Sequence, residues 1–180
     1  MIATPSPGKK EETNIVYLKD LLVVDDRLGD VLRELGQFAK AKQVYEANWL
    51  RSESVRAFYK FDEKVWYVSE QAISSLLVLA EKEGNRKDQL FNYSREQKLL
   101  REKLAYAQSN PEAFEVEDVT AAKFDLAKSQ YRHARMLDAS ERQPLLAEAA
   151  SLSQEVLKLS PKDPDANALH DAIKDLMTQE

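Results

Sequence analysis

Turn-forming residues are rare in this chain, which carries only four glycines and six prolines in 180 residues. A sandwich or barrel of many short strands needs far more of these residues at its turns. Long helices joined by a few short connections need few. Apolar residues make up 43% of the chain, enough for a continuous core, and charged residues make up 32%, which implies a well-solvated surface. The sequence therefore predicts an all-α fold.

Apolar residues recur at three- and four-residue steps along most of the chain, as they do on one face of a helix. Gly36 and Gly84 follow two of these stretches, where a glycine readily adopts the left-handed conformation that ends a helix. The first stretch contains Leu18, Leu21, Leu22, Leu28, Val31, Leu32 and Leu35. The pattern predicts seven helices, over residues 15–35, 38–57, 62–83, 87–108, 116–137, 141–159 and 164–177.

Three polar signals mark expected helix starts. Asn110 precedes Pro111, and Asp163 precedes Pro164, so that in each pair a side-chain acceptor stands before a residue that has no N–H to satisfy. Ser140 is the expected cap of the sixth helix, with Pro144 near its first turn.

The polar segment 1–13 is expected to be a disordered leader or linker before a helical domain over residues 14–180. It lacks the apolar stretch of a signal peptide, and no later segment approaches the length of a membrane span. The chain has no cysteine, which excludes disulfides and thiolate metal sites and suits a reducing compartment. We therefore expect a cytoplasmic protein without membrane contact.

One helical hairpin carries a recognisable pattern. Leu28-Gly29 is followed by Leu32, Gly36, Phe38, Ala41 and Tyr45, so that small residues stand where two helices meet and bulky ones fill the space beside them. These residues resemble the tetratricopeptide repeat. The resemblance departs at Asn48, where the family prefers alanine, and its register after residue 60 is open.

The resemblance implies about three antiparallel hairpins stacked as a right-handed superhelix, and the helix from Pro164 would then be the capping helix of the array. Gly84 and Tyr93 stand 48 residues after Gly36 and Tyr45, a longer period than the usual ~34. A closed helical bundle is the alternative fold.

The inner wall of such a superhelix would bind a partner protein or peptide. In the expected register this wall includes Asp26, Asp30 and Arg33 from the first hairpin, and Tyr131 and Asp138 from the third. The acids predict a basic or mixed-charge partner. They could equally be solvated charges on a helix surface.

Chemical motifs are missing. The two histidines, His133 and His170, lie in different expected helices and lack the spacing of a metal site. Asp163, Asp165 and Asn167 alternate like a calcium loop, but Ala168 and Lys174 stand where such a loop needs glycine and glutamate. We expect no enzyme activity, no metal and no cofactor. The net charge of −5 argues against nucleic acid.

The sequence thus predicts a protein-interaction module or adaptor. Two alternatives remain, a regulatory domain that senses a peptide or small ligand and a homo-oligomeric scaffold. The scaffold would use Trp49 or the aromatic residues around the second turn, which are Phe58, Tyr59, Phe61, Trp66 and Tyr67. Packing between adjacent hairpins is the competing explanation for these aromatics.

Overall fold

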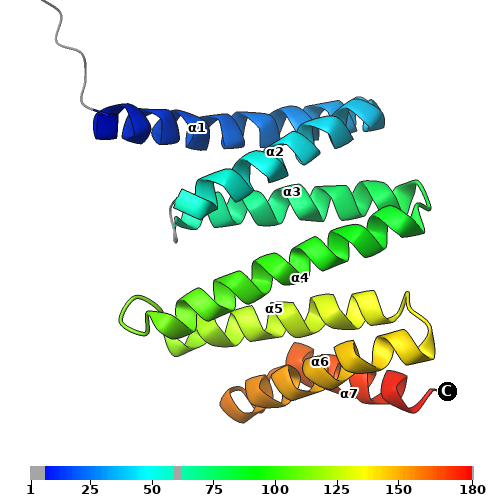
Figure 1. Cartoon of the computed structure of the whole chain (residues 1–180). Helices are drawn as coiled ribbons and strands as arrows, with labels where there is room; N and C mark the ends of the chain where they lie inside the picture. The colour runs from blue at the N-terminus through cyan, green and yellow to red at the C-terminus, as the bar shows by residue number, and fades with distance from the viewer. Residues whose placement is uncertain (1–6, 59–61, 180) are drawn as a thin grey trace, which may run out of the picture. The chain divides into compact units, whose positions relative to one another are not determined.

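The computed structural model describes residues 7–58 and 62–179, and every element within them is an α-helix (Figure 1). The helices are α1 (Pro7–Glu34), α2 (Phe38–Phe58), α3 (Glu63–Lys82), α4 (Arg86–Ser109), α5 (Val116–Ala134), α6 (Ala139–Leu159) and α7 (Pro164–Thr178). The predicted all-α class and the seven helices are confirmed, and six of the seven expected starts lie within two residues of the observed ones.

Helix α1 is the exception, since it begins at Pro7. The helix therefore begins within the segment 1–13, whose assignment as a leader or linker stays a prediction. Residues 1–6 lie outside the described residues.

Local signals explain most helix ends. Gly36 and Gly84 adopt φ values of +72° and +63°, the left-handed conformation expected after α1 and α3. The carboxylate of Asp163 accepts hydrogen bonds from the backbone N–H groups of Asp165 and Ala166 at 2.9 and 3.0 Å. The predicted cap of α7 is confirmed.

Two predicted caps are wrong by a few residues. Asn110 closes α4, and α5 begins after Glu115, whose backbone N–H donates to the carboxylate of Asp118. Helix α6 starts after Asp138 rather than Ser140, so that Pro144 lies inside the helix and beyond its first turn. Where several polar residues precede a helix, more than one of them can accept hydrogen bonds from its first N–H groups. The sequence alone does not show which residue is the cap.

The chain divides into two compact units, Met1–Glu83 and Gly84–Glu180, each of which we describe by itself. In the first unit α1 packs on α2, α2 packs on α3, and α3 also contacts α1. Gly29 is buried against the ring of Tyr45, and Ala41 is fully buried beside it. The close helix contact predicted for Gly29 and Ala41 is confirmed.

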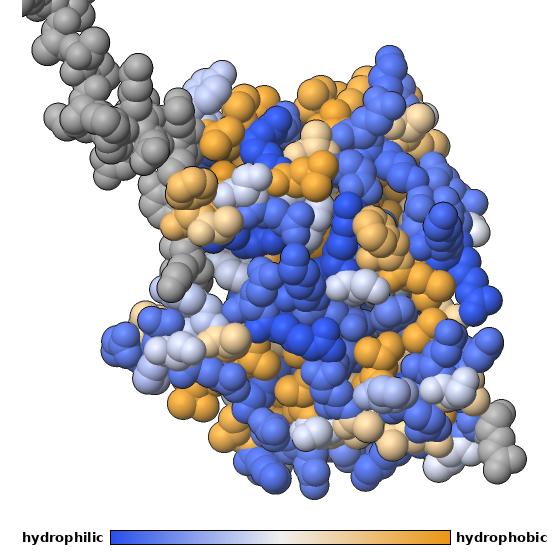
Figure 2. All heavy atoms as spheres, viewed as in Figure 1, coloured by the Kyte–Doolittle hydropathy of each residue, from blue (hydrophilic) through white to orange (hydrophobic). Residues whose placement is uncertain are grey.

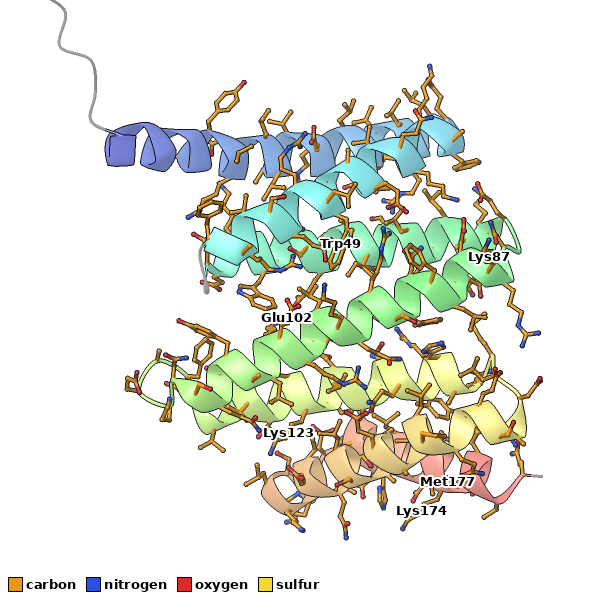
Figure 3. The ribbon with its side chains drawn as sticks, in the orientation of Figure 1. Trp49, Lys87, Glu102, Lys123, Lys174 and Met177 are labelled. Atoms are coloured by element: carbon orange, nitrogen blue, oxygen red, sulfur yellow. The ribbon has the colours of Figure 1, made fainter. Side chains whose placement is uncertain are left out.

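Two buried polar residues join the helices of this unit. Asn48 donates from its side-chain amide to the carbonyl of Leu22 at 3.1 Å, across the α1–α2 contact. Arg56 lies 4.9 Å from the ring centroid of Trp49 and 5.5 Å from that of Trp66, and it donates to the hydroxyl groups of serines on α2 and α3. Trp49 is only 1% exposed (Figure 3), so the scaffold contact expected of it is excluded. Tyr59 and Phe61 lie outside the described residues.

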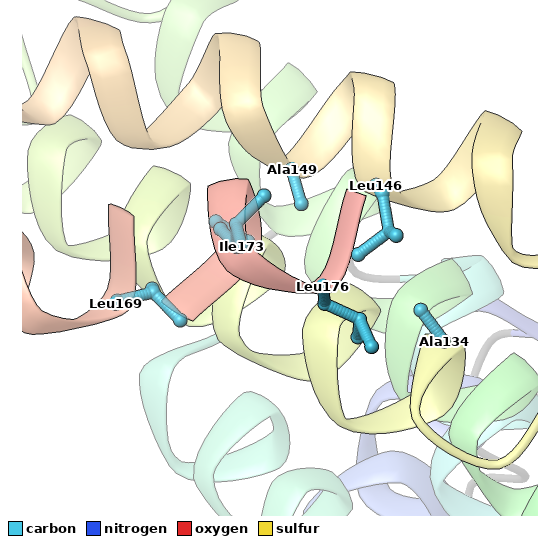
Figure 4. Close-up of a cluster of buried hydrophobic side chains, with 7 residues drawn as sticks. Ala134, Leu146, Ala149, Leu169, Ile173 and Leu176 are labelled. Carbon is cyan, nitrogen blue, oxygen red and sulfur yellow. The ribbon is translucent and has the colours of Figure 1, made fainter. Parts of the chain in front are cut away.

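In the second unit each helix packs on the next, α4 on α5, α5 on α6 and α6 on α7, with a further contact between α5 and α7. One buried cluster joins α5, α6 and α7 (Figure 4). It consists of Ala127, Ala134, Leu146, Ala149, Leu169, Ile173 and Leu176. This cluster fixes α7 against α5 and so sets the width of the surface between them.

The apolar stripe predicted on the first helix divides into two faces. Leu22 is buried in the core, whereas Leu28, Val31 and Leu35 are 45%, 51% and 65% exposed. A three- and four-residue spacing cannot by itself tell one broad face from two. Helix α1 therefore carries more apolar surface than its own unit covers.

Candidate functional site: a basic pocket between α5 and α7

A pocket of about 290 Å³ opens between α5 and α7 in the second unit. Its lining consists of Phe124, Lys128, Tyr131, Arg132, Arg135, Asp165 and Leu169. Four of these residues come from α5 and Arg135 directly follows its end, at spacings that place them along one side of the helix. The volume is at the lower limit of small-ligand pockets, and an open pocket of this size suits one or two side chains of a peptide.

Three cations dominate the polar part of the lining, namely Lys128, Arg132 and Arg135. Asp165, in the first turn of α7, is the one acid among the lining residues. Asp125 on α5 lies outside the lining and interacts electrostatically with Lys128 and Arg132, so it offsets part of their charge. The pocket is positive in a chain whose net charge is −5.

Aromatic rings hold two of the cations near the pocket. The Lys128 ammonium lies 5.7 Å from the ring centroid of Phe124, and the Arg135 guanidinium lies 5.9 Å from that of Tyr131. Such contacts restrain long side chains without neutralising them. In the part of the chain that the structure describes, no salt bridge engages any of the three cations.

The floor of the pocket belongs to the core. Leu169 is 8% exposed and is part of the buried cluster that joins α5, α6 and α7, and the half-buried Phe124 and Tyr131 pack against the same cluster. A buried apolar floor beside exposed cations is typical of sites that bind an apolar side chain together with a neighbouring negative charge.

The first-hairpin residues predicted for the binding wall lie near one another, but one of them is buried and the other two form a salt bridge. Asp26 is 7% exposed, and burial raises its pKa above the usual aspartate value. Asp30 accepts a hydrogen bond from the Tyr45 hydroxyl at 2.8 Å and forms a salt bridge with Arg33 at 3.0 Å. This group ties α1 to α2 and leaves little charge to offer a partner.

The two predicted third-hairpin residues fall in different places. Tyr131 lines the pocket, whereas Asp138 is the exposed residue before α6 and is not part of the lining. Lys128, Arg132 and Arg135 are not among the residues predicted from the sequence. Their spacing from Phe124 and Tyr131 places them on one side of a helix and could have indicated a local basic site. The acidic net charge of the whole chain does not reveal such a site.

Both histidines contact neighbouring side chains of the second unit. His133 is half-buried, stacks on Tyr93 with ring centroids 5.7 Å apart, and its Nδ1 atom is 3.0 Å from the Gln97 amide. Burial lowers its pKa. His170 lies 2.8 Å from the Ser153 hydroxyl. Across residues 7–58 and 62–179 we find no cluster of three or more His, Asp or Glu side chains arranged for a metal ion.

The chain matches no protein-family model, and neither a curated protein nor a solved structure is significantly similar to it. Among the described helices, none has the length and apolar character that crossing a bilayer requires.

Proposed function

We propose that this chain is a tetratricopeptide-like interaction module that binds an acidic segment of a partner protein in the pocket between α5 and α7. The observation that supports this most directly is the set of three cations around an apolar floor, none of which forms a salt bridge with another residue that the structure describes. The Gly29–Tyr45 contact and the buried Ala41 support the repeat assignment of the first hairpin.

The proposed partner differs in charge from the one that the sequence predicted. That prediction relied on Asp26 and Asp30, of which Asp26 is buried and Asp30 is bound to Tyr45 and Arg33. A peptide with an aromatic or leucine side chain flanked by aspartate or glutamate fits the α5–α7 pocket better, since Leu169 and Tyr131 would contact its apolar side chain and the arginines its carboxylates. The chemistry of such a module is binding alone, with no catalytic step.

The test is fluorescence anisotropy with three labelled peptides of equal length. Each contains one central leucine, flanked by glutamates in the first, lysines in the second and serines in the third. The proposal predicts saturable binding of the glutamate peptide, weakened by added salt because exposed charges are screened. Equal affinity for all three peptides would contradict it, as would preference for the lysine peptide.

Variants connect the binding to the pocket. Arg132→Glu reverses a charge in the lining, and Lys158→Glu makes the same kind of change at an exposed position of α6 outside it. The pocket variant is expected to weaken glutamate-peptide binding by about tenfold or more, whereas the control changes it by less than about threefold. If the two variants weaken binding equally, the cause is the overall charge and the pocket is not the site.

A further inference from the structure

Helix α1 is apolar on two opposite sides. One side, which includes Leu22 and the buried Gly29, packs on α2 and α3. Val31 follows Leu22 by nine residues, about two and a half helical turns, and therefore lies on the far side. A second apolar side that the surrounding helices leave exposed is a candidate contact surface.

The far side forms a continuous stripe with a coiled-coil spacing. Its members follow one another at steps of four, three, four, three and four residues, and all but the half-buried Leu21 are 45–65% exposed. They are Tyr17, Leu21, Val24, Leu28 and Val31 of α1 together with Leu35, the residue directly after its end, and we call them the α1 seam. Figure 2 shows hydrophobic, orange side chains among hydrophilic ones along the upper edge, over α1, and in Figure 3 side chains extend from this helix away from α2 and α3.

We propose that the α1 seam binds the same seam of a second copy of the chain, with the two helices antiparallel. In heptad terms the leucines Leu21, Leu28 and Leu35 occupy a positions, and Tyr17, Val24 and Val31 occupy d positions. Two antiparallel copies related by a two-fold axis at residue 26 bring every seam residue opposite another. The resulting layers are Tyr17–Leu35, Leu21–Val31 and Val24–Leu28, each formed twice.

This register explains why a second copy suits the seam. Each central layer sets a leucine against a smaller valine, so that the layers have similar volumes. A parallel pair would instead stack leucine on leucine at a and valine on valine at d, the arrangement that two-stranded parallel coils disfavour. The exposed fractions of the six side chains correspond to roughly 500 Å² per copy, so that a pair would bury at most about 1,000 Å², the lower limit for a specific interface.

The oligomeric state of the full chain is the first test. Sedimentation equilibrium between about 1 and about 100 µM is expected to show a reversible increase from the monomer mass of 20.6 kDa toward twice that mass. Leu28→Lys is expected to raise the dissociation constant at least about tenfold, because the ammonium would enter an apolar layer in both copies. Leu159→Lys, at an exposed leucine of α6 with 54% exposure, is the matched control and leaves the mass distribution unchanged. A chain that stays monomeric throughout overturns the proposal, and so does a dimer that tolerates Leu28→Lys.

The second test determines whether the two helices are antiparallel. Because the chain has no native cysteine, only the introduced cysteines can form a disulfide. Under oxidising conditions a mixture of Val24→Cys and Leu28→Cys chains is expected to form a mixed disulfide, because these positions face each other. Either variant alone should cross-link poorly, since its two cysteines would be displaced by four residues, about 6 Å along the axis. Efficient cross-linking of Val24→Cys with itself, unimproved by the second variant, would overturn the antiparallel arrangement. Both tests are independent of the α5–α7 pocket, so that either proposal can fail without the other.

Discussion

A β-carbon placed on Gly29 would lie 2.4 Å from the Cε1 atom of Tyr45, a separation that real side chains do not tolerate. Helix α1 thus approaches α2 as closely as its backbone allows, and the tyrosine ring fills the space that a side chain would occupy. The ring hydroxyl then reaches Asp30, one residue further along α1. One glycine and one tyrosine therefore define both the spacing and the polar connection of this helix pair.

Gly29→Ala is expected to destabilise the chain. Alanine gains about 0.5–1 kcal/mol over glycine within a helix, but overpacking a buried contact costs about 1–3 kcal/mol, so the steric term prevails. Urea unfolding measures the difference. A double-mutant cycle provides the control, since in a Tyr45→Leu background the same substitution should lose most of its cost. An undiminished cost in that background would show that Tyr45 is not the obstacle.

Tyr45→Phe tests the bond to Asp30. Loss of this buried hydrogen bond is expected to reduce the free energy of unfolding by about 1 kcal/mol at neutral pH. Tyr17→Phe, at an exposed tyrosine of the same unit, should change stability little. Equal effects of the two substitutions would contradict a structural role for the bond.

The same tyrosine should make the free energy of unfolding depend on pH in the alkaline range. Burial and then the hydrogen bond to Asp30 raise the pKa of Tyr45 from 10.0 to about 12, with the Ser75 contact acting in the opposite direction. A raised folded-state pKa means that the contribution to stability is complete below pH 10 and declines as the pH rises toward 12. The difference in unfolding free energy between wild type and Tyr45→Phe should therefore shrink across that window. A difference that stays constant would contradict the raised pKa.

His133 should make stability sensitive to mild acid. Burial lowers its pKa from 6.5, so the folded chain binds the proton more weakly than the unfolded chain and loses stability as the pH falls below 6.5. His133→Phe retains a ring against Tyr93 but cannot become charged. Thermal unfolding between pH 7 and pH 5 should show a shallower decline for this variant. His170→Asn, at the chain's other histidine, is the control. If this variant makes the decline of stability between pH 7 and pH 5 equally shallow, His133 is not the cause.

Asp163→Ala removes the two backbone hydrogen bonds that cap α7. The expected loss of stability is about 1 kcal/mol, whereas Asp165→Ala, which removes an acid from the same turn, should cost only a few tenths through the helix dipole. Since α7 forms one wall of the pocket, the cap variant should also weaken binding of the glutamate peptide. A stable variant with unaltered binding would show that the cap is dispensable.

The sequence predicted local structure well because local structure has local causes. Gly36, Gly84 and Asp163 act within one turn of chain, and each ends or begins a helix where expected. Exposure is a different matter, because it depends on which other helices are present. Leu22 and Leu28 look alike in the sequence, yet one is buried and the other is exposed, and only the packing of α2 and α3 distinguishes them.

The candidate site was harder to predict for the same reason. Tyr131 was predicted but the cations beside it were not, and the pocket that they line forms only where Leu169 and Asp165 of α7 lie against α5. Asp26 and Asp30 were predicted as partner-binding residues because the expected repeat register would place them facing a groove. In the structure Asp26 is buried, and Asp30 contacts Tyr45 and Arg33.

The measurement that tests the proposed function most directly is a ¹H–¹⁵N correlation spectrum of the full chain, titrated with the glutamate-flanked leucine peptide. The account predicts saturable shifts of backbone amides that are concentrated on α5 around Lys128–Arg135 and on the first turns of α7. Arg132→Glu should abolish these shifts and Lys158→Glu should preserve them. Shifts that are absent at saturating peptide, or that centre on helices other than α5 and α7, would contradict the account.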